Sequence, residues 1–222
     1  MPHGIRILPD NVPQHVVNRG NRKARIFWSP ADYLGFIAAM ADAAEKTVVR
    51  LMAFCLMPNH WHLVFWPHTG REISNYMQIM MNSHLRDLLP RNGLVGSGHV
   101  YKGRFRNHPI HNERHFLNVC RYVESNALRA NLIERAEDWP WSSLACEGPA
   151  PGINLLARPW PVPRPKNWIE QVNTRLEEAP IPKAWTTFER PATREDAIRA
   201  IASPTQLEVT RTQSTRIVTL SS

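Results

Sequence analysis

The chain of 222 residues carries 27 Lys and Arg against 19 Asp and Glu, which gives a formal net charge of +8. A basic surplus of this size favours a polyanionic partner, either nucleic acid or an anionic membrane surface. We expect no secretory signal and no membrane-spanning helix, because the N-terminus lacks an apolar core and no run approaches about 20 apolar residues. The three cysteines lack paired spacing and indicate reduced thiols. These features predict a cytoplasmic, nucleoid-associated protein.

Hydrophobic periodicity predicts seven elements in the order β-α-β-β-α-β-α. Two apolar strands joined by a tight turn at Met57-Pro58-Asn59 form a central hairpin. The elements are a strand at 14–19, a helix at 30–45, strands at 48–57 and 60–67, a helix at 71–89, a strand at 99–110, and a helix at 112–136 with a break near Ser125-Asn126. This order is typical of a ferredoxin-like α+β sandwich, in which helices pack on a central antiparallel sheet.

The composition changes near residue 148. Six prolines fall between Pro149 and Pro165, and neither a helical nor a strand period survives there. Residues 166–178 could form one short helix, and the Thr-, Ser-, Arg- and Pro-rich end that follows is predicted to be disordered. We therefore predict a domain at 1–148 and a Pro-rich linker with a tail at 149–222.

Two histidines stand two positions apart at the start of the second hairpin strand. Side chains alternate across a strand, so His60 and His62 share one face, and Trp61 points to the other, into the core. Histidine is a common metal ligand, although two histidines near a strand start can also be ordinary solvated or core residues. The pair is therefore a candidate metal site that needs a third ligand.

Two partners are open for that third ligand. Cys55 would give a zinc site with His60 and His62, but it lies in an all-apolar strand, where a free Cys is usually buried. Asn126 follows Tyr122 by four positions, which puts both on one helix face; the alternative is a core aromatic and a helix cap. An amide beside two imidazoles would suit Mg²⁺ or Mn²⁺, which could polarise a phosphodiester for attack by the phenol. A phenol with an ordinary pKa of about 10 needs positive charge nearby to act as the nucleophile.

The segments AFCLMPNHWHLVFWP (53–67) and RYVESNALRANL (121–132) resemble the single-tyrosine HUH transposases that act on single-stranded DNA. The resemblance is to their REP-associated tyrosine transposase branch in particular. Three further segments support it: HVVNRGNRKARIF (15–27), VYKGRFRNHPI (100–110) and DWPWSSL (138–144). Together the five segments stand in order between residues 14 and 145.

This resemblance implies a catalytic role for Tyr122 and a divalent metal, Mg²⁺ or Mn²⁺, held by His60, His62 and Asn126. It implies an endonuclease that cuts single-stranded DNA and leaves a 5′-phosphotyrosine link and a free 3′-OH. Attack by another 3′-OH on this link would rejoin strands. Such cutting and joining is the chemistry of DNA transposition and recombination. REP-associated relatives recognise hairpins of repetitive palindromes. They also suggest a monomer whose tyrosine acts in cis, and a dimer is left open.

Two features depart from the relatives. Relatives usually carry N-P-V-R-A where this chain has NALRA (126–130), a change that spares Asn126 but alters how the helix breaks. Relatives often end in a basic segment with Arg and Gly that helps to hold hairpin DNA, whereas this chain continues into PIPKAWTTFERPATRED (180–196). A catalytically decayed or domesticated hairpin-binding protein is therefore the alternative to an active transposase.

Basic residues cluster in two places and are candidates for DNA contacts. The first group follows the strand at 14–19, and the second alternates along the predicted strand at 99–110, as a row of phosphate contacts on one face would. A solvated face is the alternative. The candidate DNA-binding residues are Arg19, Arg22, Lys23, Lys102, Arg104 and Arg106.

Overall fold

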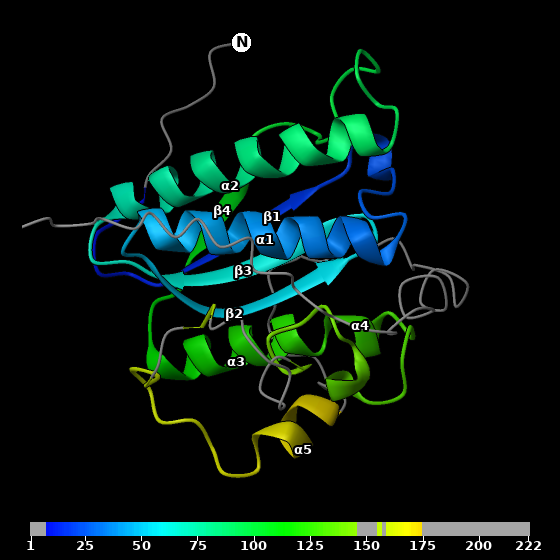
Figure 1. The fold of residues 1–222 in the computed structure, drawn as a ribbon. Helices are drawn as coiled ribbons and strands as arrows, with labels where there is room; N and C mark the ends of the chain where they lie inside the picture. The colour runs from blue at the N-terminus through cyan, green and yellow to red at the C-terminus, as the bar shows by residue number, and fades with distance from the viewer. Residues whose placement is uncertain (1–7, 146–154, 157–158, 175–222) are drawn as a thin grey trace, which may run out of the picture.

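The computed structural model describes residues 8–145, 155–156 and 159–174, and it is built on a four-stranded antiparallel sheet (Figure 1). The strand order is β2-β3-β1-β4. The strands are β1 (Gln14–Arg19), β2 (Arg50–Met57), β3 (His60–Trp66) and β4 (Arg106–Pro109). The connections are α1 (Pro30–Lys46) between β1 and β2, and α2 (Gly70–Arg91) between β3 and β4. The predicted ferredoxin-like α+β fold is confirmed.

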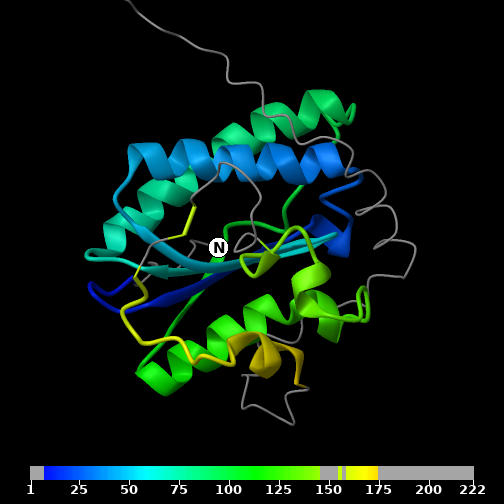
Figure 2. The same cartoon turned by 60° about the horizontal axis from the view of Figure 1, so that its bottom comes forward.

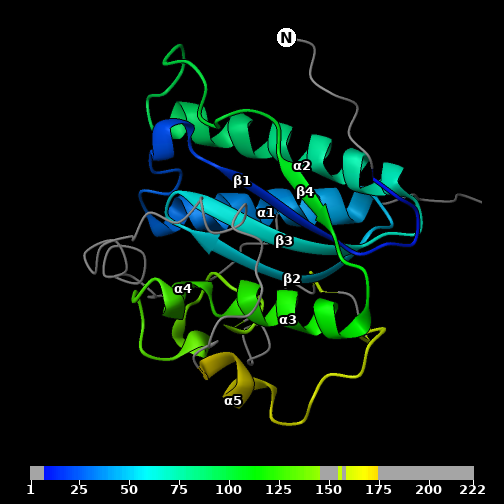
Figure 3. The same ribbon diagram turned by 180° about the vertical axis from the view of Figure 1, so that it is seen from behind.

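Helices cover both faces of the sheet. The long helices α1 and α2 lie on one face, as the views from the front and from behind both show (Figures 1 and 3). The other face carries α3 (Glu113–Glu124), α4 (Asn126–Arg129) and α5 (Trp168–Asn173), which come forward in Figure 2. Because both faces are covered, β2 and β3 are almost entirely buried, and apart from Arg50, His60 and His62 their residues are apolar on both faces.

Two helix starts follow local sequence signals. Ser29 and Asp32 form a reciprocal capping box at the start of α1, with Pro30 in the first turn, which satisfies amide groups that the helix leaves unpaired. At the start of α3, the side chain of Asn112 accepts a hydrogen bond from the backbone N–H of His115 at 2.8 Å. These caps explain why α1 begins at the predicted residue and α3 begins one residue after the predicted start.

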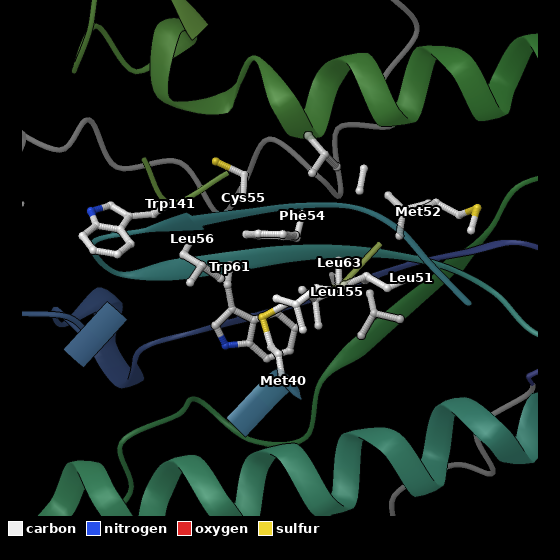
Figure 4. Packing of buried hydrophobic residues seen from close by; sticks show 14 of the residues in the cluster. Met40, Leu51, Met52, Phe54, Cys55, Leu56, Trp61, Leu63, Trp141 and Leu155 are labelled. Carbon is white, nitrogen blue, oxygen red and sulfur yellow. The ribbon is translucent and has the colours of Figure 1, made fainter. Parts of the chain in front are cut away.

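Trp61 anchors β3 to the layer of α1 and α2. Its side chain is fully buried, its ring lies 5.7 Å from that of Phe36, and its Nε1–H donates to the Tyr101 hydroxyl at 3.2 Å. Figure 4 shows Trp61 beside Met40 on one side of the hairpin, with Cys55 on the other. The prediction that Trp61 points from β3 into the core is therefore confirmed.

The outer edge of β2 is covered by the chain that follows η2 (Ala136–Asp138). The backbone N–H of Leu56 donates to Trp141 O at 2.8 Å, and that of Ser143 donates to Phe54 O at 2.9 Å. Such cover prevents an edge strand from pairing with another chain. Trp139 and Trp141 are both buried, so this segment packs against the sheet and is not exposed for stacking on bases.

The prediction of one strand across 99–110 is wrong. Only Arg106–Pro109 pairs with β1 as a strand. Tyr101 forms an isolated bridge with Gly20, which lies between β1 and η1 (Asn21–Lys23). Between them the chain bends at 102–104, where Gly103 adopts a φ of 155° and its carbonyl accepts from the Asn18 amide at 3.0 Å. Lys102, Arg104 and Arg106 therefore do not share one strand face.

The helix predicted at 112–136 breaks at Ser125 as expected but ends earlier. Asn131 has a φ of 54°, the left-handed conformation that closes many helices. The N–H groups of Asn131 and Leu132 donate back to the carbonyls of Leu128 and Ala127 at 2.9 and 3.0 Å. This pair of bonds satisfies the last carbonyls of α4 and stops the helix at Arg129.

Beyond the central fold, α5 is shorter than the helix predicted at 166–178. Residues 175–222 lie outside the described part of the chain, so the predicted disordered tail is untested, as is the domain boundary at 148. Among the described helices, none combines the length and the apolar character that crossing a bilayer requires.

Candidate active site

His60 and His62 lie side by side on the face of β3 that α3 covers. Their exposed fractions are 2% and 1%, their ring centroids are 4.9 Å apart, and their ring planes meet at 87°. The two imidazoles therefore share one face of the strand, as alternation predicts.

Tyr122 and Asn126 reach the same place from the helix layer. Tyr122, in the last turn of α3, is fully buried and stands edge-on to His62, with ring centroids 5.7 Å apart. Asn126 opens α4 just after the break at Ser125 and is also buried. Burial lowers the pKa of His60 to about 4, and the nearby Asn126 side chain opposes that shift. The structure thus brings all four predicted site residues together.

Each of the two histidines has one engaged and one unpaired ring nitrogen. The Nδ1 of His60 lies 2.7 Å from the Oδ1 of Asn59, and the Nδ1 of His62 lies 2.8 Å from the Nε2 of His15. Both Nε2 atoms, together with the Nδ2 of Asn126, are buried and lack a hydrogen-bond partner. Buried polar atoms without hydrogen-bond partners are uncommon and cost stability, so three of them in one cluster indicate a candidate ligand site.

The charge state of the histidines suits a divalent cation. Burial lowers the pKa of His62 well below its ordinary value, as it does for His60, so both rings are neutral at pH 7. A neutral imidazole keeps a lone pair on one nitrogen, which is the form that binds a metal. Two such nitrogens and an amide fit a divalent cation with coordination positions left open.

The zinc alternative with Cys55 finds no support. Cys55 pairs with His62 across the sheet, but its Sγ contacts the Sδ of Met57 at 3.8 Å, and burial raises the pKa of its thiol above the ordinary range. Within the described residues, no three His, Cys, Asp or Glu side chains are grouped so that they could hold a metal ion. Cys55 is a core residue on the sheet.

Two neighbours of the site were not among the predicted residues. His15 of β1 is fully buried and contacts His62, and burial lowers its pKa to about 3. Arg129, seven positions after Tyr122, places its guanidinium 5.1 Å from the centre of the phenol ring and supplies positive charge beside it. Helical spacing of seven could have indicated Arg129, whereas nothing local to His15 shows which strand it will meet.

Glu124 forms a second buried polar cluster on α3. Its carboxylate accepts hydrogen bonds from the Ser143 hydroxyl at 2.7 Å, from Arg164 Nη2 at 3.1 Å and from the Trp168 indole at 2.6 Å. The Arg164 guanidinium also lies over the rings of Trp160 and Trp168. These contacts hold the described part of the C-terminal segment, residues 159–174, against α3.

Arg19, Lys23 and Lys102 lie around the end of the sheet where His60 lies. Arg19 pairs with His60 across the sheet, and its carbonyl accepts from the N–H of Lys102 at 3.0 Å. The loop of Arg22 and Lys23 contacts the turn before His60, since Asn59 Nδ2 lies 3.4 Å from Lys23 O. The exposed members of the set are Arg22, Lys23, Lys102, Arg104 and Arg106.

Comparison with known proteins shows relatives of this chain. The model of the family described as "Transposase IS200 like" matches residues 10–126, and the chain belongs to that family. A REP-associated tyrosine transposase of Haemophilus influenzae is 25% identical over 122 residues, which span 50% of this chain and 69% of that protein.

A solved structure of a REP-associated tyrosine transposase bound to a REP hairpin is also similar to this chain. It superposes with a TM-score of 0.55 at 15% identity, covering 72% of this chain and 99% of that one. At this identity the match shows the shared fold. The recognition of a REP-associated tyrosine transposase from the sequence motifs is confirmed by the three comparisons together.

Proposed function

We propose that this protein is a metal-dependent transposase that cuts and rejoins single-stranded DNA through Tyr122. The observation that carries the proposal is the buried convergence of Tyr122 on two neutral histidines whose Nε2 atoms lack partners. His60, His62 and Asn126 would hold Mg²⁺ or Mn²⁺, which when bound polarises the scissile phosphodiester. Membership of the IS200-like transposase family supports an enzyme that acts on DNA.

In the proposed reaction the Tyr122 hydroxyl oxygen attacks phosphorus as its proton is lost. A tyrosine O–P bond forms and the P–O3′ bond breaks, leaving a 5′-phosphotyrosine and a 3′-OH that takes up a proton. Attack by a 3′-OH reverses these bond changes and releases Tyr122. The guanidinium of Arg129 beside the phenol supplies positive charge that favours both the phenolate and an approaching phosphate.

The proposed substrate is hairpin DNA with an adjoining single strand, of the kind formed by repetitive palindromes. The similar solved transposase was bound to a REP hairpin, and in this chain the exposed Lys23 and Lys102 lie near the end of the sheet where His60 lies. Contacts of Lys and Arg with phosphates would make such binding fall steeply as salt rises.

The deciding test is formation of a covalent protein–DNA adduct. Labelled hairpin DNA with single-stranded flanks is incubated with Mn²⁺ or with EDTA, and the products are separated in SDS. We expect an SDS-resistant adduct with the wild type and Mn²⁺, none with EDTA, and none with Tyr122→Phe. Tyr101→Phe is the matched control, because Tyr101 is also buried but lies on the opposite face of the sheet.

A covalent adduct that still forms with Tyr122→Phe would show that Tyr122 is not the nucleophile. A native-gel shift that is equal in both proteins, without metal and without any adduct, would instead identify the alternative, a hairpin-binding protein that does not cut.

A further inference from the structure

His15 occupies a fixed place next to the candidate metal site. On β1 it pairs with Val64 of β3 and with His108 of β4, so it is a diagonal neighbour of His62 on the adjacent strand. Its side chain points to the face of the sheet that α3 covers. Its side chain is fully buried, and its ring centroid lies 6.3 Å from that of Tyr122. Sequence motifs contain His15, but the proposed chemistry gives it no role.

The contact between His15 and His62 is an in-plane hydrogen bond. Their ring planes differ by only 13°, and their centroids are 5.0 Å apart. That separation is close to the 2.8 Å between His15 Nε2 and His62 Nδ1 plus the two ring radii, so the rings meet edge to edge and are not stacked face on. A ring N–H and a ring lone pair both lie in the ring plane, so this geometry suits an N–H···N bond.

A similar contact exists at the other histidine. The Nδ1 of His60 faces the amide oxygen of Asn59, which can only accept, so that nitrogen carries the proton and the Nε2 keeps its lone pair. For His62 the same tautomer requires that Nδ1–H donates to His15 Nε2. The opposite tautomer would put the proton on His62 Nε2, the buried nitrogen whose lone pair a metal would need.

We propose that His15 is a positioning residue that accepts from His62 Nδ1–H and thereby directs the lone pair of His62 Nε2 into the site. His15 would do for His62 what Asn59 does for His60, so both ligands are prepared in the same tautomer before a metal arrives. This inference rests on the proposed function, because the need for a lone pair at His62 Nε2 comes from the metal, but the tautomer can be measured without metal.

The tautomer can be measured in the metal-free, full-length protein. Histidine ¹⁵N shifts and two-bond ¹H–¹⁵N correlations distinguish Nδ1–H from Nε2–H, and we expect Nδ1–H at both His60 and His62. His15→Gln, whose amide oxygen can still accept, should keep the His62 tautomer, whereas His15→Phe should convert it to Nε2–H or a mixture. His84→Phe is the control, since His84 is buried in α2 without contact to the site.

Mn²⁺ titration supplies the second readout. Loss of a partner that orients a metal-binding histidine typically weakens affinity about 10–100-fold, so we expect a loss in this range for His15→Phe. The loss should be less than about threefold for His15→Gln and His84→Phe.

Wild-type His62 in the Nε2–H tautomer overturns the proposal, even if His15→Phe fails to fold. An unchanged tautomer or unchanged Mn²⁺ affinity in a folded His15→Phe does so as well. A wild type that binds no Mn²⁺ but shows the expected tautomers would overturn the metal site of the proposed function and leave the tautomer assignment standing.

Discussion

Two buried polar clusters lie along one short stretch of helix, and they differ in how well their atoms are satisfied. Both oxygens of Glu124 accept hydrogen bonds from Ser143, Arg164 and Trp168. Two residues earlier, Tyr122 faces histidines whose Nε2 atoms have no partner. A satisfied cluster stabilises the fold, whereas an unsatisfied one costs stability and is retained where function requires it.

The difference extends to charge. Glu124 forms an ion pair with Arg164, whose side chain is 15% exposed. This ion pair holds the segment that contains α5 against α3. The site histidines are neutral because burial disfavours their charged forms. We therefore interpret the Glu124 cluster as structural and the histidine cluster as a ligand site, and the following experiments would break or sharpen that distinction.

The largest expected effect on stability comes from Glu124→Gln. This change leaves the Arg164 guanidinium without its counter-charge in a mostly buried place, and removing one partner of such a pair costs about 3 kcal/mol. Urea unfolding of the metal-free protein measures the change. Asp42→Asn is the control, because Asp42 pairs with Lys46 at the surface, where ion pairs contribute less than about 1 kcal/mol. Equal effects of the two changes would contradict a structural role for Glu124.

Acid should destabilise the metal-free protein through its buried histidines, and His84 allows a test outside the site. Burial lowers the pKa of His84 to about 4, below an unfolded value of about 6.5, so the unfolded chain binds the proton first. The stability that neutral His84 provides is present above pH 6.5 and is lost as the pH falls towards 4.

Between pH 6.5 and 4.5, one histidine with this pKa difference lowers the free energy of unfolding by about 2–3 kcal/mol. His84→Phe should therefore reduce the loss in unfolding free energy over this range by that amount, as measured by urea unfolding at several pH values. Exposed His68 is the control, and His68→Gln should leave the pH profile unchanged. A His84→Phe profile that matches the wild type would contradict the assignment.

A pair of alanine substitutions compares the two clusters directly. Ser143→Ala removes a hydroxyl bonded to Glu124 and to the backbone of Phe54, and should cost about 1–2 kcal/mol. Asn126→Ala removes an amide whose Nδ2 has no partner and should cost less than about 0.5 kcal/mol while weakening Mn²⁺ binding. Thermal unfolding and Mn²⁺ titration of both variants test this. A larger stability loss for Asn126→Ala, with unchanged Mn²⁺ binding, would make Asn126 a structural cap.

The smallest effect is expected at the basic rim of the site. Lys102→Gln should weaken hairpin binding a few-fold and reduce the slope of log affinity against log salt by about 1, because one phosphate contact is lost. Fluorescence anisotropy at several salt concentrations gives the slope. Exposed Arg71, at the start of α2, is the control, and a similar change for Arg71→Gln would show that net charge matters and not position.

Local patterns were sufficient for much of the fold and for the shared faces of the four candidate site residues. A period of two assigned the opposite faces of β3 to Trp61 and to the histidines, and helical spacing of four paired Tyr122 with Asn126. The helix predicted from residue 30 begins there as α1, after Ser29 as its N-cap. The strand predicted at 99–110 failed because its bend depends on contacts with β1, which no local period reveals.

By itself, the sequence determined which side chains share a face and where the helices begin, because these depend on neighbours along the chain. Only the tertiary structure decided that His15 meets His62, 47 positions away, and that Arg164 reaches Glu124. The contact of His15 with His62 depends on β1 lying beside β3 and on the register of their pairing. Strand order and register are set by packing of the whole sheet, so a local pattern does not encode them.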